Sequence, residues 1–168
     1  MTEILKAETL KQIADIEEMA REIWTDHYVP VVGQQQVDYM LEKFQSERAI
    51  LNQLSEGYEY YLLMQDGENA GYMAVVPTPE TNQLMISKLY VSKSARGGGL
   101  GRKMVAFAED ICKEQGLSGV WLTVNKNNRS SIDWYIRSGF KNAGSIVMDI
   151  GNGFVMDDYR MEKTVIPL

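Results

Sequence analysis

The sequence predicts a mixed α/β (α+β) domain, and three observations indicate this class. Segments with strand-like spacing of apolar residues alternate with segments of helical spacing along the chain. One predicted strand leads through a glycine-rich loop into a helix and then into another strand, which requires a parallel crossover if the two strands are neighbours. The length of 168 residues suits one domain, 1–168.

The first third of the chain is predicted to contain a short strand and three helices. The strand covers 2–7. Thr9 precedes Gln12 at the spacing of a capping box, which predicts a helix start, and helically spaced apolar residues extend this helix to about Trp24. Two more helices follow: one is marked by Val37, Met40, Leu41 and Phe44, and the other is capped by Ser46 and ends near Gly57.

A β-hairpin is predicted in the middle of the chain. The segment 58–65 is aromatic and apolar, Asp66-Gly67 is a turn dipeptide, and the return strand covers 70–76. We expect Pro77 and Pro79 to close the hairpin, because proline is disfavoured inside strands.

The second half of the chain alternates strands with helices. The predicted order is a strand over 84–91, a glycine-rich loop, a helix over 100–115, a strand over 120–124, a helix over 129–138, and strands over 140–150 and 154–165. Gly116 is suited to follow the end of the first of these helices. The crossover would make the strands at 84–91 and 120–124 parallel.

Composition and charge narrow the class of protein. A formal charge of −6 disfavours binding to bulk nucleic acid and weakly favours a cationic substrate. The single Cys112 and single His27 exclude a disulfide framework and sites with several cysteine or histidine ligands, so no metal is expected. No apolar stretch reaches the roughly 18 residues of a membrane span and no signal pattern opens the chain, so we expect a cytoplasmic protein without a membrane partner.

The segment from Arg96 to Arg102 carries the clearest chemical signal. Its glycines allow consecutive backbone N–H groups to face one concavity, the helix start adds partial positive charge, and the two arginines add full charge. This combination predicts a site for a phosphate or a diphosphate. The P-loop motif and the dinucleotide fingerprint fail on spacing, whereas Arg-x-x-Gly-x-Gly is satisfied by Arg96, Gly99 and Gly101.

Two blocks of the sequence resemble the GNAT superfamily of N-acetyltransferases. The first is the strand end Leu89-Tyr90-Val91 with the loop that follows it. The second is Asn128, Ser131 where alanine is usual, Tyr135 and Gly139-Phe140. The resemblance implies the acyl-CoA N-acyltransferase fold, with a mostly antiparallel central sheet, one splayed parallel strand pair and helices on both faces. The sequence looks most similar to bacterial spermidine/spermine N-acetyltransferases.

The resemblance also implies acetyl-CoA as co-substrate. The backbone of the strand end would pair with the pantetheine amides, and N–H groups of the loop would hold the diphosphate. Asn128 would contact the pantetheine arm, and Tyr135 would lie near the thioester sulfur. The expected cofactor-binding residues are Leu89, Tyr90, Val91, Arg96, Gly97, Gly98, Gly99, Leu100, Gly101, Arg102 and Asn128.

Acetyl transfer to an amine sets further requirements. The amine must be neutral, although a free alkylamine has a pKa of roughly 10.4. The oxyanion needs a donor, for which the Val91 amide is the candidate, and Tyr135 is the candidate catalytic acid for the leaving thiolate. The strand before the loop has no carboxylate to accept a proton. A water chain, or one of Glu22, Asp26 and His27, is the alternative.

The acceptor site is expected around the end of the first helix. In the spermidine/spermine enzymes an aromatic-rich helix end helps to shape this site, and Trp24, Asp26 and Tyr28 stand in a similar stretch. Asp26, Asp157 and Asp158 are carboxylates available to bind a polycation. We therefore expect a small-molecule primary amine as partner, with a polyamine as the leading candidate, and leave a homodimer open.

Several of these residues have a plain structural alternative. Asn128 can be the N-cap of the next helix, and Tyr135 can be a core aromatic residue. Cys112 is expected to be buried and inert, His27 to lie on the surface or in a loop, and Asp157 and Asp158 to belong to a solvated turn or strand edge. The alternative functions are a non-catalytic acyl-CoA sensor and a protein or peptide amine acetyltransferase.

Overall fold

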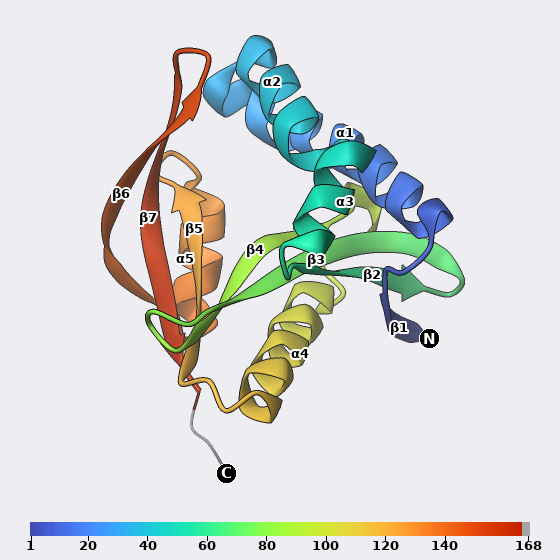
Figure 1. Cartoon of the computed structure of the whole chain (residues 1–168), viewed down its shortest axis with the longest axis vertical. Helices are drawn as coiled ribbons and strands as arrows, with labels where there is room; N and C mark the ends of the chain where they lie inside the picture. The colour runs from blue at the N-terminus through green and yellow to red at the C-terminus, as the bar shows by residue number, and fades with distance from the viewer. Residues whose placement is uncertain (166–168) are drawn as a thin grey trace. The chain divides into compact units, whose positions relative to one another are not determined.

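The computed structural model describes residues 1–165 of the chain (Figure 1). The elements, in chain order, are β1 (Thr2–Lys6), α1 (Leu10–Val32), α2 (Gln34–Gln45), α3 (Glu47–Ser55), β2 (Glu59–Gln65), β3 (Glu68–Thr78), β4 (Gln83–Val91), the 3₁₀ turn η1 (Lys93–Ala95), α4 (Leu100–Glu114), β5 (Gly119–Asn125), α5 (Arg129–Arg137), β6 (Lys141–Gly151) and β7 (Phe154–Thr164). The predicted helices and strands are all present, and the end of α1 is the main difference in their bounds.

The strands follow one another in the sheet in the order β1-β2-β3-β4-β5-β7-β6. β4 and β5 are parallel, whereas β1–β2, β2–β3, β5–β7 and β6–β7 are antiparallel. The parallel ladder joins residues 83–85 to residues 119–121, at the start of each strand. The predicted mixed sheet with one parallel pair joined by a helical crossover is therefore confirmed.

Two compact units divide the chain, and each is built from two separate segments. Unit 1 comprises residues 1–76 and 88–105, and unit 2 comprises residues 77–87 and 106 onward. β3, β4 and α4 therefore contribute residues to both units. The expectation of a single domain over 1–168 stays a prediction, and its last three residues lie outside the described part of the chain.

The strands of unit 1 are covered on both faces. Residues 60–63 of β2 are consecutive and all buried, although successive side chains of a strand point to opposite faces. In Figure 1, α1, α2 and α3 lie above β2 and β3, and the start of α4 lies below them. Polar contacts tie the strands to α2 as well, since the Gln45 side chain donates to the Tyr60 hydroxyl at 2.9 Å and accepts from the Tyr72 hydroxyl at 2.7 Å.

α1 begins as predicted but continues past Trp24 to Val32. Thr9 Oγ1 accepts a hydrogen bond from Gln12 N at 3.2 Å, and the Gln12 side chain accepts one from Thr9 N at 3.0 Å, so the capping box is confirmed. The predicted end is wrong because the helical backbone continues to Gly33, where φ reaches +89°. Pro30 lies inside this helix.

The hairpin between β2 and β3 turns at Asp66 and Gly67. Both have positive φ, 52° and 83°, as a two-residue type I′ turn requires. β3 continues through Pro77 to Thr78 and ends directly before Pro79, so the expected closure is confirmed at Pro79 and wrong at Pro77. Proline is tolerated here because it stands one residue from the end of the strand, where a lost ladder hydrogen bond matters least.

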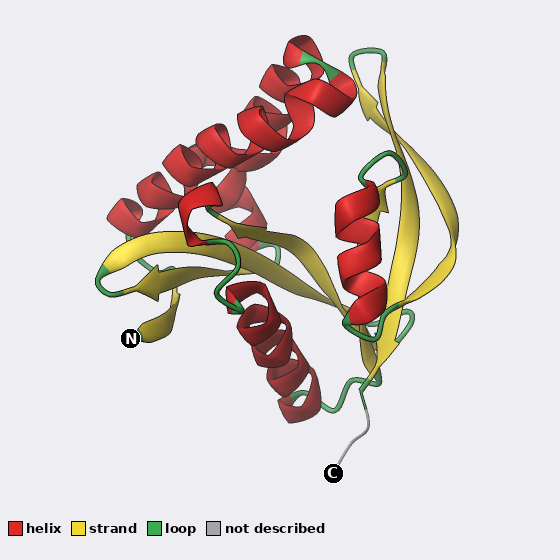
Figure 2. Cartoon of the chain, turned by 180° about the vertical axis from the view of Figure 1, so that it is seen from behind, coloured by secondary structure: helices red, strands yellow, loops and turns green. Residues whose placement is uncertain are grey.

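Alternate residues of β5 supply the core of unit 2. Val120, Leu122 and Val124 are buried, as is Cys112 on α4, which confirms the expected place of this cysteine. α4 ends in a Schellman motif: Leu117 N donates to Cys112 O at 2.9 Å, and the N–H of Gly116, whose φ is +69°, donates to Lys113 O at 3.1 Å. Figure 2 shows α5 beside the long hairpin formed by β6 and β7.

Candidate active site

The glycine-rich loop lies in unit 1, between η1 and the first residue of α4. Gly97 and Gly99 have positive φ, 89° and 75°, and a Cβ at either position would meet no atom within 4 Å. Residues with side chains rarely adopt this conformation, so glycine is needed for the path of the backbone. The loop is exposed over residues 96–99. The space beside it is therefore accessible to a ligand.

The start of α4 has the electrostatics that an anion requires. Lys103 N donates to Gly99 O at 3.2 Å. The N–H groups of residues 100–102 therefore come before the first regular backbone hydrogen bond of α4. The aligned peptide dipoles place partial positive charge at this end, and the exposed Arg102 adds a full charge. Leu100 is buried and anchors the helix start. A diphosphate fits this combination of loop and helix end.

Arg96 joins the loop to the end of β4. Its Nε donates to the carbonyl oxygen of Val91 at 3.1 Å. The backbone is also fixed on its other side, where Ser92 N donates to Ala70 O of β3 at 2.8 Å. At Gly71, the next residue of β3, a Cβ would lie only 2.4 Å from the carbonyl oxygen of Tyr90, so close approach of the two strands requires glycine there. The end of β4 is thus held in place by both neighbours.

Four aromatic rings meet in unit 1, and we call them the aromatic cluster: Trp24 and Tyr28 of α1, Tyr72 of β3 and Tyr90 of β4. The ring centroids of Trp24 and Tyr90 lie 5.6 Å apart, those of Tyr72 and Tyr90 lie 5.5 Å apart, and the hydroxyls of Tyr28 and Tyr90 are 2.9 Å apart. Trp24 and Tyr28 share a helix face because they are four residues apart. Trp24 is buried and Tyr28 is half-buried, whereas Asp26 is exposed.

Lys88 lies beside the aromatic cluster, and sequence reasoning missed it. Its Nζ is 5.9 Å from the ring centroid of Trp24 and 5.8 Å from that of Phe44 on α2. Burial lowers the pKa of Lys88 to about 8. The signal available in the sequence was the alternation of a strand, which places residues 88 and 90 on one face of β4.

The three α1 residues considered as proton acceptors have different surroundings. Glu22 and Asp26 are exposed. His27 is half-buried, with its ring centroid 4.9 Å from that of Tyr28, so the expectation of a surface or loop histidine is wrong. The cause is the greater length of α1, which carries residue 27 within the helix. Burial lowers the pKa of His27, and the nearby charge of Arg96 lowers it further.

Asn128 and Tyr135 belong to unit 2, at the start and near the end of α5. Asn128 is buried, and its Oδ1 accepts from Ser131 N at 3.3 Å, which confirms its role as N-cap. The half-buried Tyr135 packs its ring edge-on against Phe140, with centroids 5.4 Å apart. Both residues therefore have structural contacts, and neither contact conflicts with the cofactor and acid roles that the resemblance implies.

Asp158 contradicts the expectation of a solvated turn or strand edge. β7 lies between β5 and β6, so it is a central strand, and Asp158 is only 4% exposed. Its Oδ1 is buried and has no hydrogen-bond partner. Burial raises the pKa of Asp158 to about 6, against the effect of a hydrogen bond with the Thr123 side chain. Asp157, in contrast, is exposed and forms an ion pair of 2.7 Å with Lys126.

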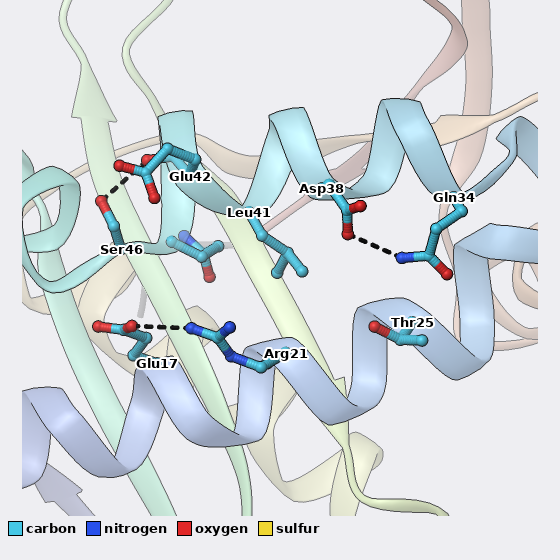
Figure 3. A pocket seen from close by; sticks show the side chains of 9 residues that line it. Glu17, Arg21, Thr25, Gln34, Asp38, Leu41, Glu42 and Ser46 are labelled. Atoms are coloured by element: carbon cyan, nitrogen blue, oxygen red, sulfur yellow. Dashed lines mark hydrogen bonds and ion pairs between the residues drawn. The ribbon is translucent and has the colours of Figure 1, made fainter.

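A pocket of about 390 Å³ lies between α1 and α2 of unit 1 (Figure 3). Figure 3 shows an ion pair of 3.1 Å between Arg21 and Glu17, and a hydrogen bond of 2.7 Å from Gln34 to Asp38, in its wall. Its lining residues differ from those that the sequence assigned to acetyl-CoA or to the acceptor.

Residues 1–165 offer neither a metal-binding group of side chains nor a membrane-spanning helix. In this part of the chain, no group of three or more His, Cys, Asp or Glu side chains is placed to hold a metal ion. The helices described there are also too short or too polar to cross a membrane.

Comparison with known proteins identifies the family of the chain. The profile of the Acetyltransferase (GNAT) family matches residues 15–140, which include both sequence blocks discussed above. An uncharacterized N-acetyltransferase in the pepI 3′ region of Lactobacillus delbrueckii subsp. lactis is 26% identical over 163 residues, covering 93% of this chain and 94% of that protein.

Two other proteins are similar in part of the sequence or in fold. A streptothricin acetyltransferase of Streptomyces lavendulae is 35% identical over 79 residues, which cover 47% of this chain and 42% of that protein. The crystal structure of PaiA N-acetyltransferase from Thermoplasma acidophilum in complex with coenzyme A has a TM-score of 0.80 at 20% identity, covering 98% of this chain and 99% of that one. The similarity to PaiA N-acetyltransferase, at 20% identity, concerns the fold alone.

Proposed function

We propose that this chain, which belongs to the Acetyltransferase (GNAT) family, transfers the acetyl group of acetyl-CoA to a primary amine of a small molecule. Family membership makes the chain an acetyltransferase with acetyl-CoA as its co-substrate, which favours an enzyme over a non-catalytic sensor. The observation that carries the proposal is the exposed loop with two glycines of positive φ directly before the N-terminus of α4.

The loop is proposed to bind the diphosphate of acetyl-CoA. The N–H groups from Gly97 to Arg102 would donate to its oxygens, and Arg96 and Arg102 would balance its charge. The backbone of Leu89 and Val91 would pair with the pantetheine amides in the manner of an added strand. The hydrogen bond from Arg96 to Val91 O supports this arrangement, because it fixes the strand end and the loop as one piece of backbone.

The reaction is proposed to proceed by direct attack of the amine on the acetyl carbon. The Val91 N–H would donate to the oxyanion as it forms, and Tyr135 would protonate the departing sulfur. No covalent bond between acetyl group and protein is required. The edge-on contact between Tyr135 and Phe140 supports the role of Tyr135, because it holds the Tyr135 ring through its carbon atoms.

The aromatic cluster is proposed to bind the acceptor, with a polyamine as the first candidate. Tyr28 and the exposed Asp26 support this choice, since a ring and a carboxylate both attract an alkylammonium. Lys88 adds a condition: below a pH of about 8 it places a positive charge beside Trp24 and Phe44. An acceptor whose reacting nitrogen is neutral near Lys88 is therefore favoured.

The test is a panel of amines assayed for release of thiol from acetyl-CoA. The panel contains spermidine, spermine, a streptothricin and a peptide with a free N-terminus, and CoA affinity is measured separately by calorimetry. We expect CoA to bind and at least one small-molecule amine to release thiol, with spermidine first. Binding of CoA without thiol release from any amine would contradict the proposed transfer, and release from the peptide alone would contradict the small-molecule acceptor.

A further inference from the structure

β6 ends the sheet within unit 2. It is the last strand in the order of the sheet, and within residues 1–165 the strand that it pairs with is β7 alone (Figure 1). Residues 141–145 and 147–149 of β6 are exposed, although successive side chains of a strand point to opposite faces. Among the described residues, this part of β6 therefore lies open at its outer edge and on both faces.

The regular part of the strand is the segment 144–149. Its residues pair one by one with residues 160–155 of β7, and a register shift lies at each end of the segment. At these shifts the N–H groups of Gly144 and Gly151 donate to side chains of β6 itself, at 2.9 and 2.8 Å. Such bulges blunt an edge strand, so the segment between them is the part suited to pair with a further strand.

The exposed side chains of this segment are mainly apolar. Val147 is 66% exposed and Met148 is 48% exposed, on opposite faces of the strand, and Ile146 is half-buried. An exposed apolar edge strand is a template for another strand, and proteins commonly protect such an edge with lysine or proline. The segment contains neither, and Asp149 is its one charged residue. Pairing with a further strand would cover these apolar side chains.

The segment is complementary to itself in the antiparallel direction. A two-fold axis at Val147 places this residue of one copy opposite Val147 of a second copy. The same axis places Ile146 opposite Met148, and Ser145 opposite Asp149. Opposite residues share a face of the sheet, so apolar pairs form on both faces. The Ser145 hydroxyl is a donor and the Asp149 carboxylate an acceptor, so the polar pair matches as well.

The two nearest registers lack this match. An axis at Ile146 places Val147 opposite the polar Ser145. An axis at Met148 places Val147 opposite the charged Asp149. The composition of the segment therefore favours the axis at Val147 over its neighbours.

The charge beside this axis is already compensated. Asp157 of β7 lies opposite Val147 and forms an ion pair of 2.7 Å with Lys126. Its carboxylate therefore opposes the approach of a second copy less than an isolated charge would.

We propose that the outer edge of β6 is an interface with a second copy of this chain, in which residues 145–149 of the two copies pair antiparallel about an axis at Val147. Such an interface is isologous, because both copies contribute the same residues. The pairing of β6 with β7 stays as it is within each copy. The inference does not depend on the proposed function, because it uses no residue assigned to acetyl-CoA or to the acceptor.

Sedimentation equilibrium of the full chain measures the interface. We expect the wild-type protein to be dimeric at micromolar concentration. Val147→Lys should raise the dissociation constant of the dimer at least about 30-fold, because the substitution occurs twice at the centre and sets two like charges opposite each other. The matched control is Ile136→Lys, at an isoleucine of α5 that is 50% exposed, and it should leave the dimer unchanged.

Disulfide cross-linking tests the register of the pair. The native Cys112 is buried, so Val147→Cys supplies the accessible thiol. Opposite residues of an antiparallel pair have Cα atoms roughly 4.5–5.5 Å apart, which a disulfide can bridge. We expect mild oxidation with copper–phenanthroline to give covalent dimers of Val147→Cys, whereas Ile136→Cys should stay largely uncross-linked.

Three outcomes would overturn the inference. One is a wild-type protein that stays monomeric up to millimolar concentration. Another is a dimer that Val147→Lys leaves as tight as the wild type, since a different surface would then hold it. The third is Val147→Cys cross-linking no faster than Ile136→Cys, and this result decides even if Val147→Lys does not fold.

Discussion

At the scale of the residue, the first prediction concerns Tyr135, which we propose as the acid that protonates the leaving sulfur. Tyr135→Phe keeps the ring contact with Phe140 at 5.4 Å and removes only the hydroxyl. We expect kcat for thiol release to fall about 100-fold, because protonation of the leaving sulfur is lost. The Kd for CoA should stay within about twofold in calorimetry. Tyr58→Phe, at a half-buried tyrosine before β2, is the control, and a wild-type kcat in Tyr135→Phe would place the acid elsewhere.

Lys88 makes stability depend on pH. Burial lowers its pKa from the usual 10.5 to about 8, so between these values the unfolded chain binds a proton that the folded chain does not. Stability therefore rises as pH increases from 8 to 10.5, and the full penalty is present below pH 8. Removing the charge with Lys88→Met removes this penalty.

Urea unfolding at two pH values measures the effect of Lys88→Met. The variant should be more stable than wild type by about 1–3 kcal/mol at pH 7, and this gain should shrink at pH 10. Lys93→Met, at an exposed lysine of η1, should show no such difference. An equal gain at both pH values would mean that packing of the methionine, and not the charge, is responsible.

At the scale of the element, we expect the backbone conformation of the loop before α4 to determine how tightly CoA binds. Gly99 has a φ of +75° and open space around the position of a Cβ. Valine there strains the backbone and places a side chain beside the proposed diphosphate. We expect Gly99→Val to weaken CoA binding at least about tenfold in calorimetry, since one charge-assisted hydrogen bond contributes roughly this much.

Gly116 provides a matched control for Gly99. It also has a positive φ, +69°, and open space, but it lies at the other end of α4. Gly116→Val should lower the free energy of unfolding by a similar strain of about 1–3 kcal/mol and leave the Kd for CoA unchanged. If both variants lost CoA affinity equally, global instability rather than the loop would be the cause.

Whether a feature could be predicted from the sequence depends on how far apart in the chain the residues that determine it lie. Caps and turns depend on neighbours in sequence, so Thr9, Asp66-Gly67 and Gly116 predicted their boundaries correctly. The extension of α1 and the burial of Lys88 and Asp158 depend on residues distant in the chain, which local patterns do not specify. Sequence reasoning therefore predicted the glycine-rich loop before α4 and missed both Lys88 and the burial of Asp158.

At the scale of the whole molecule, acetyl-CoA should stabilise the folded chain by mass action. A ligand at 100 times its Kd adds about 2.7 kcal/mol, which for a chain of this length raises the melting temperature by roughly 5–10 °C. Thermal unfolding with and without saturating acetyl-CoA measures this shift. An unchanged melting temperature in the presence of saturating acetyl-CoA would contradict binding to the folded state.

Calorimetric titration of acetyl-CoA against S-acetylpantetheine tests the role of the loop most directly. The two compounds share the thioester and the pantetheine amides, but only acetyl-CoA has the diphosphate and the adenosine 3′-phosphate beyond it, so Gly99→Val is needed to isolate the share of the loop. We expect acetyl-CoA to bind the wild-type protein at least about 100-fold more tightly, which corresponds to two or more charge-assisted hydrogen bonds, and Gly99→Val to lose most of this preference. Equal affinity of the wild-type protein for both compounds would contradict the assignment of residues 96–102 to the diphosphate.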